Sequence, residues 1–358
     1  MKDPVLSTQT SSPIRVAIAG QGRSGYNIHA RCIRSMPDRF QVVAAADQLP
    51  ERQREAADEF GARACDHWQA LIHDGDYDLF VNALPSNLHV QATIAALNAG
   101  KHVLCEKPMA MNAREGQQMV NAAEAAGKQL QISLNFRFRP EVQFCKRVIE
   151  EGAIGTPYYG RSQSIRRRGV PSWGVFGQKK LQGGGPLIDI GVHCIDWTWY
   201  LMGCPRPVAV SGQTYETIGA TPGHIGQFGV WDHKTYDVED FATALVRFEN
   251  GATMNVESAF CVNLDKNQMG CHVAGDKGGV STDPVTVQTS IAGHLVDGTP
   301  NHLQGGKLKT HWLSVEGFVK AIAAGKEVPI PASQVLWVQK IIDAIYKSAE
   351  RGKEVAIK

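Results

Sequence analysis

Asp189 and His193, a carboxylate and an imidazole four residues apart, are the first side chains whose spacing suggests chemistry. Positions i and i+4 share one face of a helix, so both side chains would point the same way if this stretch is helical. Such a pair suits proton transfer, because His is the usual general base near neutral pH. The glycine run 183–185 before them would let the backbone turn close to a bound ligand. A single His is more often structural, so the surrounding sequence has to decide between the two roles.

Lys107 is a candidate third member of this group. It follows the apolar run 102–105, which predicts a short strand. Doubly wound sheets bind ligands at the carboxyl ends of their strands. A Lys at that edge can hold a developing alkoxide by charge and hydrogen bonding.

A glycine-rich loop near the start of the chain predicts a dinucleotide site. Residues 20–25 fit G-x-G-x-x-G directly after the apolar run 14–19 and before a helical pattern. In that context Gly20 allows the tight turn, Gly22 lets the backbone approach a pyrophosphate, and Gly25 permits close packing of helix on strand. The N-terminus of the following helix offers free N–H groups to the phosphates.

Asp47 favours NAD over NADP as the dinucleotide. It lies 22 residues after Gly25 and ends the second apolar run, where a carboxylate binds the hydroxyls of the adenosine ribose. A 2′-phosphate would be repelled there, and the next residues are Gln48 and Leu49 rather than Arg. The alternative is that Asp47 only caps the helix that begins at Pro50.

Apolar runs alternate with helical patterns over the first third of the chain. Strands are expected at 14–19, 41–46, 79–84, 102–105 and 130–134, and helices at 26–36, from 50 to just before 61, around 90–99, and from 112 to 127. Asn112 with Glu115 fits a capping box, and Gly61 and Gly127 fit positions just after helix ends. This alternation predicts an α/β fold, with an N-terminal Rossmann doubly wound parallel sheet over residues 1–136.

The texture changes after about residue 137. Strands are expected at 208–214, 241–248, 253–260 and 272–274, and Asn250-Gly251 marks a hairpin turn between the second and third. Helices are expected at 141–151, 189–201, 312–323 and 333–350, and residues 215–235 as a loop. We therefore expect residues 137–358 to form an α+β domain with a large open, mainly antiparallel sheet that binds substrate and mediates oligomerisation.

Two longer motifs resemble those of the Gfo/Idh/MocA oxidoreductase family. Residues 99–108 resemble its A-G-K-H-V-x-x-E-K-P signature, and residues 183–193 its G-G-G-x-x-x-D-x-G-x-H element. Further matches follow in the same order: an N-x-R-F-like stretch at 135–138, an E-G-x-I-G turn at 151–155, an E-D-x-x-x-A strand, an N-G-A-T hairpin at 250–253 and a G-x-K-G-G turn at 275–279. The likeness covers roughly residues 14–358.

The resemblance implies a catalytic group of Lys107, Asp189 and His193. In it His193 is the general base, Lys107 orients and polarises the hydroxyl, and Asp189 positions the substrate or its neighbours. It also implies that Glu106 lies beside the nicotinamide ribose, and that the Lys107–Pro108 peptide resembles one that is often cis in the family. With the glycine loop, the expected cofactor-binding residues are Gly20, Gly22, Arg23, Ser24, Gly25, Asp47, Leu84, Pro85, Asn87, His89, Glu106, Lys107 and Asn135.

The loop after residue 165 is a candidate for further substrate contacts. Three consecutive arginines, 166–168, lead to Trp173, and this loop should hang over the cofactor crevice. An Arg with an aromatic platform suits a sugar or polyol, whose rings present apolar C–H faces together with hydroxyls. A solvated charge run and a packing Trp are the alternatives. The expected substrate-binding residues are Lys107, Arg168, Trp173, Asp189, His193 and Tyr236, with His311 as a weaker candidate.

Composition limits the other possibilities. The 358 residues suggest about two domains at roughly 150 residues each. A net charge of +2, from 37 Lys and Arg against 35 Asp and Glu, argues against a nucleic-acid binder. Eight scattered cysteines with no C-x-x-C pair predict no metal site and a reducing, cytoplasmic location, and the apolar runs are too short to span a membrane.

The expected function is NAD-dependent transfer of a hydride between the nicotinamide and a secondary hydroxyl of a sugar, inositol-like polyol or sugar derivative. An NAD-dependent glycoside hydrolase, acting by transient oxidation and elimination, is the alternative. A homodimer or homotetramer is expected, because an open sheet with one uncovered face would expose a large apolar area.

Overall fold

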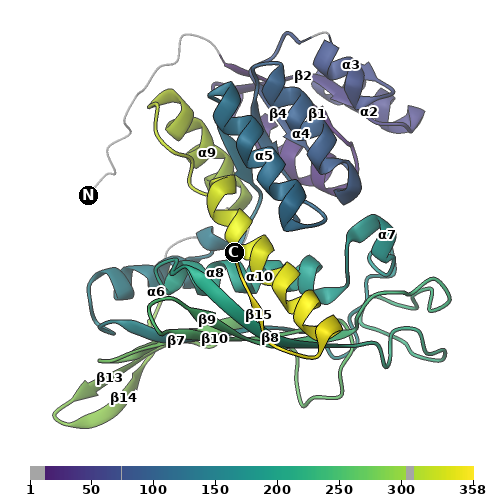
Figure 1. Cartoon of the computed structure of the whole chain (residues 1–358). Coiled ribbons are helices and arrows are strands. Elements are labelled where there is room, and N and C mark those ends of the chain that lie inside the picture. The colour runs from purple at the N-terminus through teal and green to yellow at the C-terminus, as the bar shows by residue number, and fades with distance from the viewer. Residues whose placement is uncertain (1–12, 74, 304–309) are drawn as a thin grey trace.

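Two β-sheets organise the chain in the computed structural model, which describes residues 13–73, 75–303 and 310–358. In Figure 1 the N-terminal sheet and its helices lie above the second sheet, and the long helix α10 (Ala332–Arg351) lies on the upper face of the second sheet. One apolar cluster runs through both parts, from Phe80 in the first sheet through Trp197 to Met254 in the second. The two sheets therefore share a continuous core.

The first sheet has six parallel strands in the order β3-β2-β1-β4-β5-β6, as expected for a dinucleotide-binding fold. Its strands are β1 (Ile14–Ala19), β2 (Phe40–Ala46), β3 (Arg63–Cys65), β4 (Leu79–Asn82), β5 (His102–Cys105) and β6 (Leu130–Ile132). Its helices are η1 (Arg23–Ala30), α1 (Arg31–Arg34), α2 (Pro50–Phe60), α3 (Trp68–His73), η2 (Ser86–Leu88), α4 (His89–Asn98) and α5 (Ala113–Ala126). The predicted doubly wound sheet is confirmed, while β3 and α3 were not predicted.

Local sequence signals place the helix ends as expected. α2 begins at Pro50 and ends before Gly61, whose φ of 61° only glycine adopts readily. The side chain of Asn112 accepts a hydrogen bond from the amide of Glu115 at 3.0 Å, and Gly127 closes α5 with a φ of 61°.

The second sheet has nine strands in the order β14-β13-β12-β11-β7-β10-β9-β8-β15. They are β7 (Pro157–Ile165), β8 (Pro207–Tyr215), β9 (Phe241–Phe248), β10 (Thr253–Ala259), β11 (Gln268–Gly275), β12 (Gly279–Thr282), β13 (Val285–Ile291), β14 (His294–Gly298) and β15 (Val355–Ala356). Only β7 and β10 pair in parallel, so the sheet is mainly antiparallel, as predicted. The strands β7, β12, β13, β14 and β15 were not predicted.

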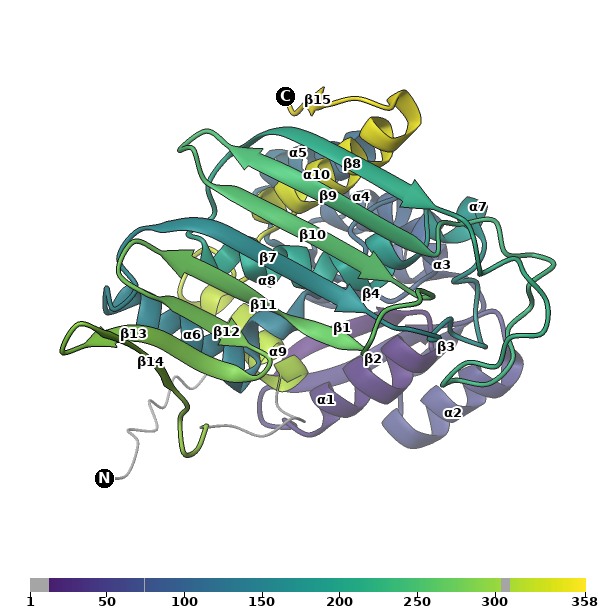
Figure 2. The same cartoon turned by 90° about the horizontal axis from the view of Figure 1, so that it is seen from below.

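Helices cover one face of this sheet. They are α6 (Pro140–Glu150), α8 (Val192–Leu201) and α10, and short turns η3 (Asn135–Phe138), α7 (Lys179–Gln182) and η4 (Leu187–Gly191) accompany them. The other face is open in Figure 2, where the strands lie in front of all helices. Within the described ranges, no helix has the length and apolar character needed to cross a bilayer.

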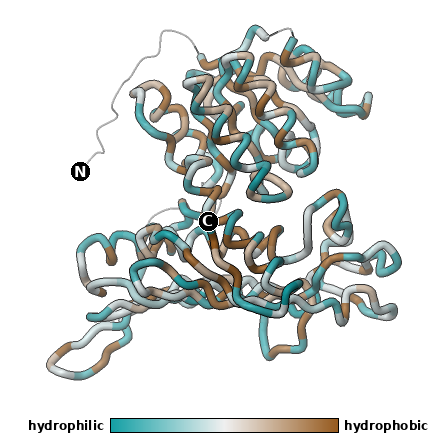
Figure 3. The backbone as a smooth tube through the Cα atoms, in the orientation of Figure 1, coloured by the Kyte–Doolittle hydropathy of each residue, from teal (hydrophilic) through white to brown (hydrophobic). Residues whose placement is uncertain are grey.

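The open face is polar, which corrects the expectation of a large apolar area. Arg161 pairs with Glu257 at 3.7 Å, Gln163 donates to the same carboxylate at 2.7 Å, and Asn255 donates to the Tyr159 hydroxyl at 3.1 Å. Exposed apolar side chains gather instead on the β13–β14 hairpin, at Ile291, Leu295 and Val296. Figure 3 shows this hydrophobic tip at the lower left.

The chain returns to the first sheet near its end, through α9 (Thr310–Ala323). Phe318 and Val319 of this helix are buried in a cluster with Val16 and Leu79 of the first sheet. Gln131, at the end of that sheet, donates to the Ser314 hydroxyl of α9 at 3.1 Å. One face of the dinucleotide-binding sheet is therefore closed by a helix that lies nearly two hundred residues further along the chain.

Candidate active site

The three glycines of the motif, two in the loop after β1 and one in η1, have the geometry that the motif predicts. A Cβ on Gly20, whose φ is 88°, would lie 2.5 Å from the carbonyl oxygen of Ala83, and one on Gly25 would lie 1.7 Å from that of Gly20. A Cβ on Gly22 would meet only the Arg52 guanidinium, at 3.7 Å. Gly20 and Gly25 are therefore required by the protein's own packing, whereas the space in front of Gly22 suits a pyrophosphate.

Asp47 ties the end of β2 to this loop. Its carboxylate accepts hydrogen bonds from the amide of Gln21 at 2.8 Å and the amide of Leu49 at 3.0 Å. The side chain thus links the glycine loop to the residues just before α2. The bond to Leu49 also places Asp47 at the start of that helix, the alternative role considered for this residue. Arg52, which the sequence analysis did not single out, lies 3.3 Å from the same carboxylate.

A cavity of about 440 Å³ opens beside Asp47. Its lining includes Gly20, Asp47, Arg52, Trp68, Leu84 and Pro85. An apolar slot with a carboxylate at the carboxyl edge of a Rossmann sheet fits the adenosine half of a dinucleotide.

His89 is buried at the start of α4, and both its ring nitrogens face backbone carbonyls. Nδ1 lies 2.7 Å from the carbonyl oxygen of Pro108, and Nε2 lies 2.9 Å from that of Leu84. These contacts connect the loops that follow β4 and β5, so the ring ties these two loops together. Asn87, another expected cofactor contact, is exposed on η2.

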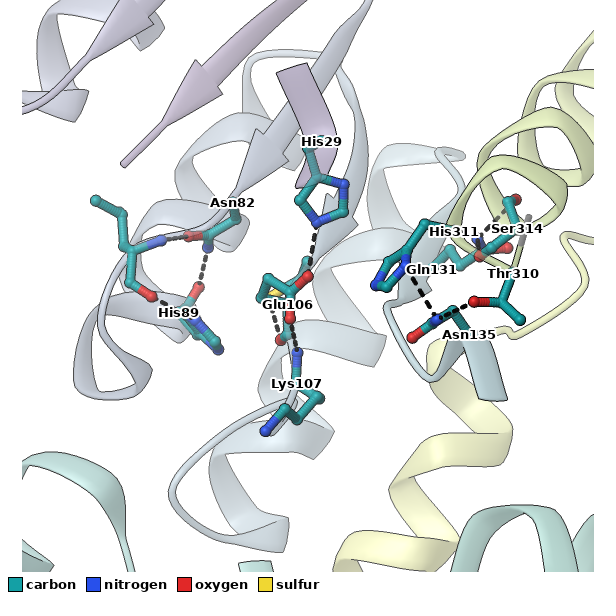
Figure 4. Close-up of polar contacts among 12 residues, drawn as sticks. His29, Asn82, His89, Glu106, Lys107, Gln131, Asn135, Thr310, His311 and Ser314 are labelled. Carbon is teal, nitrogen blue, oxygen red and sulfur yellow. Dashed lines mark hydrogen bonds and ion pairs between the residues drawn. The ribbon is translucent and has the colours of Figure 1, made fainter. Parts of the chain in front are cut away.

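Glu106 is paired with a histidine that the sequence analysis did not identify. His29, on η1, lies 2.6 Å from the carboxylate, and Figure 4 shows the two side chains pointing at one another. Burial raises the pKa of Glu106, but the hydrogen bond and charge of His29, together with the charge of Lys107, bring it down to about 2. The carboxylate is therefore ionised and held in place beside Lys107.

Asn135, at the start of η3, contacts the returning helix α9. Its amide donates to the Thr310 hydroxyl at 2.9 Å and lies 3.3 Å from Nδ1 of His311 (Figure 4). His311, the weaker candidate, thus lies at the cofactor edge of the sheet rather than in the second domain's loops.

Lys107 and Asp189 meet across the junction of the two sheets. The ammonium group donates to the Asp189 carboxylate at 2.7 Å and to the Asp189 carbonyl at 3.0 Å. The side chain of Lys107 is 20% exposed and that of Asp189 only 5%. The Lys107–Pro108 peptide is cis, as the resemblance implies.

His193 is buried beside this pair, at the start of α8. Its ring stacks on Phe136, with centroids 4.3 Å apart and an angle of 23° between the planes. Burial lowers the pKa of His193 well below its usual range; the charges of Lys107, His311 and Arg166 lower it further, and only Glu106 opposes them.

The polypeptide before Asp189 is fixed by a second carboxylate. Glu239 accepts hydrogen bonds from the amides of Gly185 at 2.8 Å and Leu187 at 3.0 Å, and from the Tyr346 hydroxyl at 2.9 Å. A Cβ on Gly184 would lie 2.1 Å from that hydroxyl, and one on Gly185 would lie 2.2 Å from the carbonyl oxygen of Glu239. The expectation that the glycine run approaches a ligand is therefore wrong for these two positions, which approach the protein itself.

Of the three consecutive arginines, Arg166 and not Arg168 packs near the turn that carries Asp189. The guanidinium of Arg168 donates to the carbonyl of Val262 at 3.3 Å and to Asn263 at 2.7 Å. The guanidinium of Arg166 lies over the ring of Phe260, 5.9 Å from its centroid, and Phe260 packs in one cluster with Ile190, the residue after Asp189. Burial lowers the pKa of Arg166, and the charge of Asp189 opposes that shift.

Tyr236 is a core residue and not a surface for substrate. Its ring packs in a cluster with Val170, Trp231 and Phe260, and its hydroxyl donates to the carbonyl of Glu239 at 3.1 Å. Burial raises the pKa of Tyr236, so the hydroxyl stays neutral. The substrate contact expected for Tyr236 is not supported by this position.

Trp173 reaches across to the glycine loop. The guanidinium of Arg23 lies over its ring, 5.4 Å from the centroid, while Phe228 packs edge-on at 5.2 Å. The Trp173 side chain keeps 42% of its surface exposed. The loop therefore hangs over the cofactor side of the crevice, as expected.

This fold and site define a two-domain enzyme of the Rossmann dinucleotide-binding class. Residues 14–134 match the model of an oxidoreductase family with an NAD-binding Rossmann fold, and residues 142–281 match the GFO/IDH/MocA C-terminal domain. The chain belongs to the Gfo/Idh/MocA family of NAD-binding oxidoreductases.

Relatives match over nearly the whole chain. It is 35% identical over 354 residues to D-glucoside 3-dehydrogenase of Escherichia coli (strain K12), covering 98% of this chain and 99% of that protein. It is 29% identical over 395 residues to levoglucosan dehydrogenase of Pseudarthrobacter phenanthrenivorans, covering 96% and 98%. A solved structure of levoglucosan dehydrogenase in complex with NADH matches with a TM-score of 0.84 and 27% identity, over 97% of this chain and 99% of that one.

Replacing Asp47 by Ser should shift cofactor preference toward NADP. The substitution removes the carboxylate that would repel a 2′-phosphate and frees Arg52, which already lies 3.3 Å away. The ratio of kcat/KM for NADP to that for NAD should rise at least about tenfold, since one charge contact is worth about 1.5–3 kcal/mol. Asp58→Ser, exposed on α2 and outside this cavity, is the matched control. An unchanged ratio in the Asp47 variant would show that this carboxylate does not read the ribose.

Proposed function

We propose that this oxidoreductase is an NAD-dependent dehydrogenase of sugars and their derivatives, inositol-like polyols included, that oxidises a secondary ring hydroxyl. The observation that carries the proposal is the 2.7 Å contact between Lys107 and Asp189 beside the buried His193. These three groups lie at the carboxyl edge of the Rossmann sheet, on the same side as the glycine loop. An acid–base pair and a cation at that edge suit proton removal from an alcohol.

The residues around the crevice fit NAD. The glycine loop with Arg23 and Ser24 would hold the pyrophosphate, Asp47 the adenosine ribose, and Glu106 the nicotinamide ribose, while Leu84, Pro85, Asn87, His89 and Asn135 would border the molecule. When bound, the nicotinamide accepts the hydride that leaves the substrate carbon.

The chain's own groups would handle the hydroxyl proton. The Lys107 ammonium donates a hydrogen bond to the substrate oxygen and stabilises the negative charge that grows there. Neutral His193 accepts the proton, so that alcohol becomes ketone as the C–H hydride departs. Asp189 keeps the ammonium group in position.

A glucoside is the first substrate to test, with the 3-hydroxyl as the reacting group. The 35% identical relative is named a D-glucoside 3-dehydrogenase, and the names of other relatives include levoglucosan and D-apiose dehydrogenases. These names favour net oxidation over the alternative, an NAD-dependent glycoside hydrolase.

Incubation of the enzyme with NAD and methyl β-D-glucopyranoside should form one NADH, followed by its absorbance, for each 3-keto glucoside detected by mass spectrometry. His193→Ala should lower kcat by about a hundredfold or more, the usual contribution of a general base, while the Kd for NADH stays unchanged. His294→Ala, on the exposed hairpin, is the matched control. Release of methanol without net NADH would favour the hydrolase, and near-normal turnover of His193→Ala would refute its role as base.

The pH profile of oxidation should have an acidic limb well below pH 6.5. His193 must be neutral to accept a proton, and its pKa is lowered by burial and by Lys107, His311 and Arg166, against Glu106. His193 is therefore protonated only at a lower pH than an ordinary His, and kcat/KM should fall only at that lower pH. Residual activity of His193→Ala should lack this limb. A limb centred above pH 6.5 that survives in that variant would contradict the assignment.

We also propose a homodimer or homotetramer that uses the open face of the second sheet, together with a cytoplasmic location. The uncovered face between β8 and β11 offers a continuous surface, and polar interfaces with aromatic anchors are common. Light scattering at micromolar concentration should give two or four chains, and a monomer would overturn the assembly.

All eight cysteines are free thiols, in keeping with a reducing compartment and the proposed cytoplasmic location. We further propose residues 1–136 and 137–358 as the domains, with α9 packing back on the first.

A further inference from the structure

Arg166 is a half-buried cation at the reacting group that the proposed proton transfer does not use. It follows the end of β7, where its amide donates to the carbonyl of Ala259 at 2.9 Å. Two residues before it, Ser164 donates to the Ser258 hydroxyl at 2.9 Å, and Ser258 donates to the carbonyl of Pro186 at 2.8 Å, so β7 ends against the turn that carries Asp189. The guanidinium lies over Phe260, which packs in one cluster with Ile190 of that turn.

Most of its hydrogen-bonding capacity is unused. A guanidinium has five N–H donors. Among the described residues, the only hydrogen bond from this side chain goes to the carbonyl of Gly169, at 3.3 Å. Its other neighbours are the ring faces of Phe228, 5.3 Å away, and Phe260, 5.9 Å away. The guanidinium therefore has N–H donors left for a ligand that supplies acceptors.

We propose that Arg166, Phe228 and Trp173 form a sugar-binding subsite, in which the guanidinium binds a hydroxyl next to the one that is oxidised. The inference rests on the proposed function and narrows its substrate to rings with neighbouring hydroxyls. Arg168 and Tyr236 do not belong to the subsite.

Charge balance favours an uncharged ligand over an anionic one. The carboxylate of Asp189 attracts the Arg166 guanidinium. Lys107 and Glu106 add one cation and one anion to the same region. The carboxylates of Asp189 and Glu106 would repel a sugar carboxylate or phosphate and so offset part of its attraction to the guanidinium. Neutral hydroxyls can use the free N–H donors without a change of charge.

The aromatic side chains complete the recognition surface. Phe228 packs edge-on against Trp173, with centroids 5.2 Å apart and an angle of 75° between the planes, and Arg166 lies over Phe228. The exposed part of Trp173 offers an apolar face to the C–H side of a pyranose ring. One surface therefore presents an apolar platform and a hydrogen-bond donor, the combination that a sugar ring needs.

The test compares the Kd values of four sugars for the enzyme–NADH complex of the wild type and of Arg166 variants, measured by calorimetry. The ligands are methyl β-D-glucopyranoside and its 2-deoxy, 4-deoxy and 6-deoxy analogues. Arg166→Met should raise the Kd of the parent glucoside by about ten- to a hundredfold, the range for a hydrogen bond from a charged donor. One of the 2-deoxy and 4-deoxy analogues lacks the hydroxyl that Arg166 binds, and the wild type should bind that analogue weakly. Arg166→Met should raise the Kd of the same analogue by no more than about threefold, because its contact with Arg166 is already missing. The 6-deoxy analogue should show the full effect of the substitution.

Arg167→Met is the matched control, since Arg167 is exposed one residue away. It should leave every Kd unchanged, and the Kd for NADH should be the same in all variants. Arg166→Lys keeps the charge but loses the forked donor set, so it should show the same selective loss in weaker form and serves if the Met variant does not fold.

Several results would overturn the subsite. These are an equal loss for all four sugars, no loss for any, a parallel loss of NADH affinity, or failure of the wild-type complex to bind any of the sugars. Tighter binding of methyl glucuronide than of the glucoside, abolished in Arg166→Met, would show an anionic ligand instead. If the cycle behaves as expected but no NADH forms from the glucoside, the subsite stands and the proposed dehydrogenase function fails.

Discussion

The contact between Lys107 and Asp189 is the constraint on which the active site depends. Lys107 belongs to the loop after β5 of the dinucleotide-binding sheet, and Asp189 to η4 above the second sheet. A single ammonium group donates both to the carboxylate and to the backbone carbonyl of Asp189, which fixes the position of the turn as well as the side chain. Each partner is held from its own side, by the His29–Glu106 pair in the first part and by the hydrogen bonds of Glu239 in the second.

The second sheet gives this contact a rigid base. Trp197 and Trp199 of α8 are both buried in the shared apolar core, and Ser258 of β10 donates to the carbonyl of Pro186 at 2.8 Å. Asp240 accepts hydrogen bonds from three consecutive amides, 217–219, and so anchors the long loop that carries Phe228. The adjacent residues Glu239 and Asp240 therefore fix the catalytic turn and the rim of the crevice together.

Much of the fold and the centre of the site could be predicted because their signals are local. The glycine loop, the capping box at Asn112 and the turn at Asn250-Gly251 each act within a few residues, and the structure shows all three. Lys107, Asp189 and His193 were found by short spacing and by resemblance, and the structure brings these groups to the same place, although their roles remain proposals.

The errors arise where side-chain direction depends on long-range packing. Strand alternation cannot decide among three arginines once β7 has ended at Ile165, so the sequence favoured Arg168, although Arg166 packs near the turn of Asp189. The glycine run is explained by Glu239 and Tyr346, and Tyr236 by its cluster with Val170 and Phe260, all of which are distant in the sequence. His29 faces Glu106 from a π-helical segment, which shifts side chains away from ordinary 3.6-residue periodicity. The polar character of the open sheet face depends on strands such as β7 that have no clear alternating pattern.

The most direct test of the central claim is a double-mutant cycle on Lys107 and Asp189. The quantity to measure is kcat/KM for NAD-dependent oxidation of methyl β-D-glucopyranoside in Lys107→Met, Asp189→Asn and the double variant. If the pair acts as one unit, each single change should lower kcat/KM by more than about tenfold and the double variant should be no worse than about threefold below the poorer single variant. A double variant whose loss equals the product of the two single losses would show that Lys107 and Asp189 act independently, and would contradict this account.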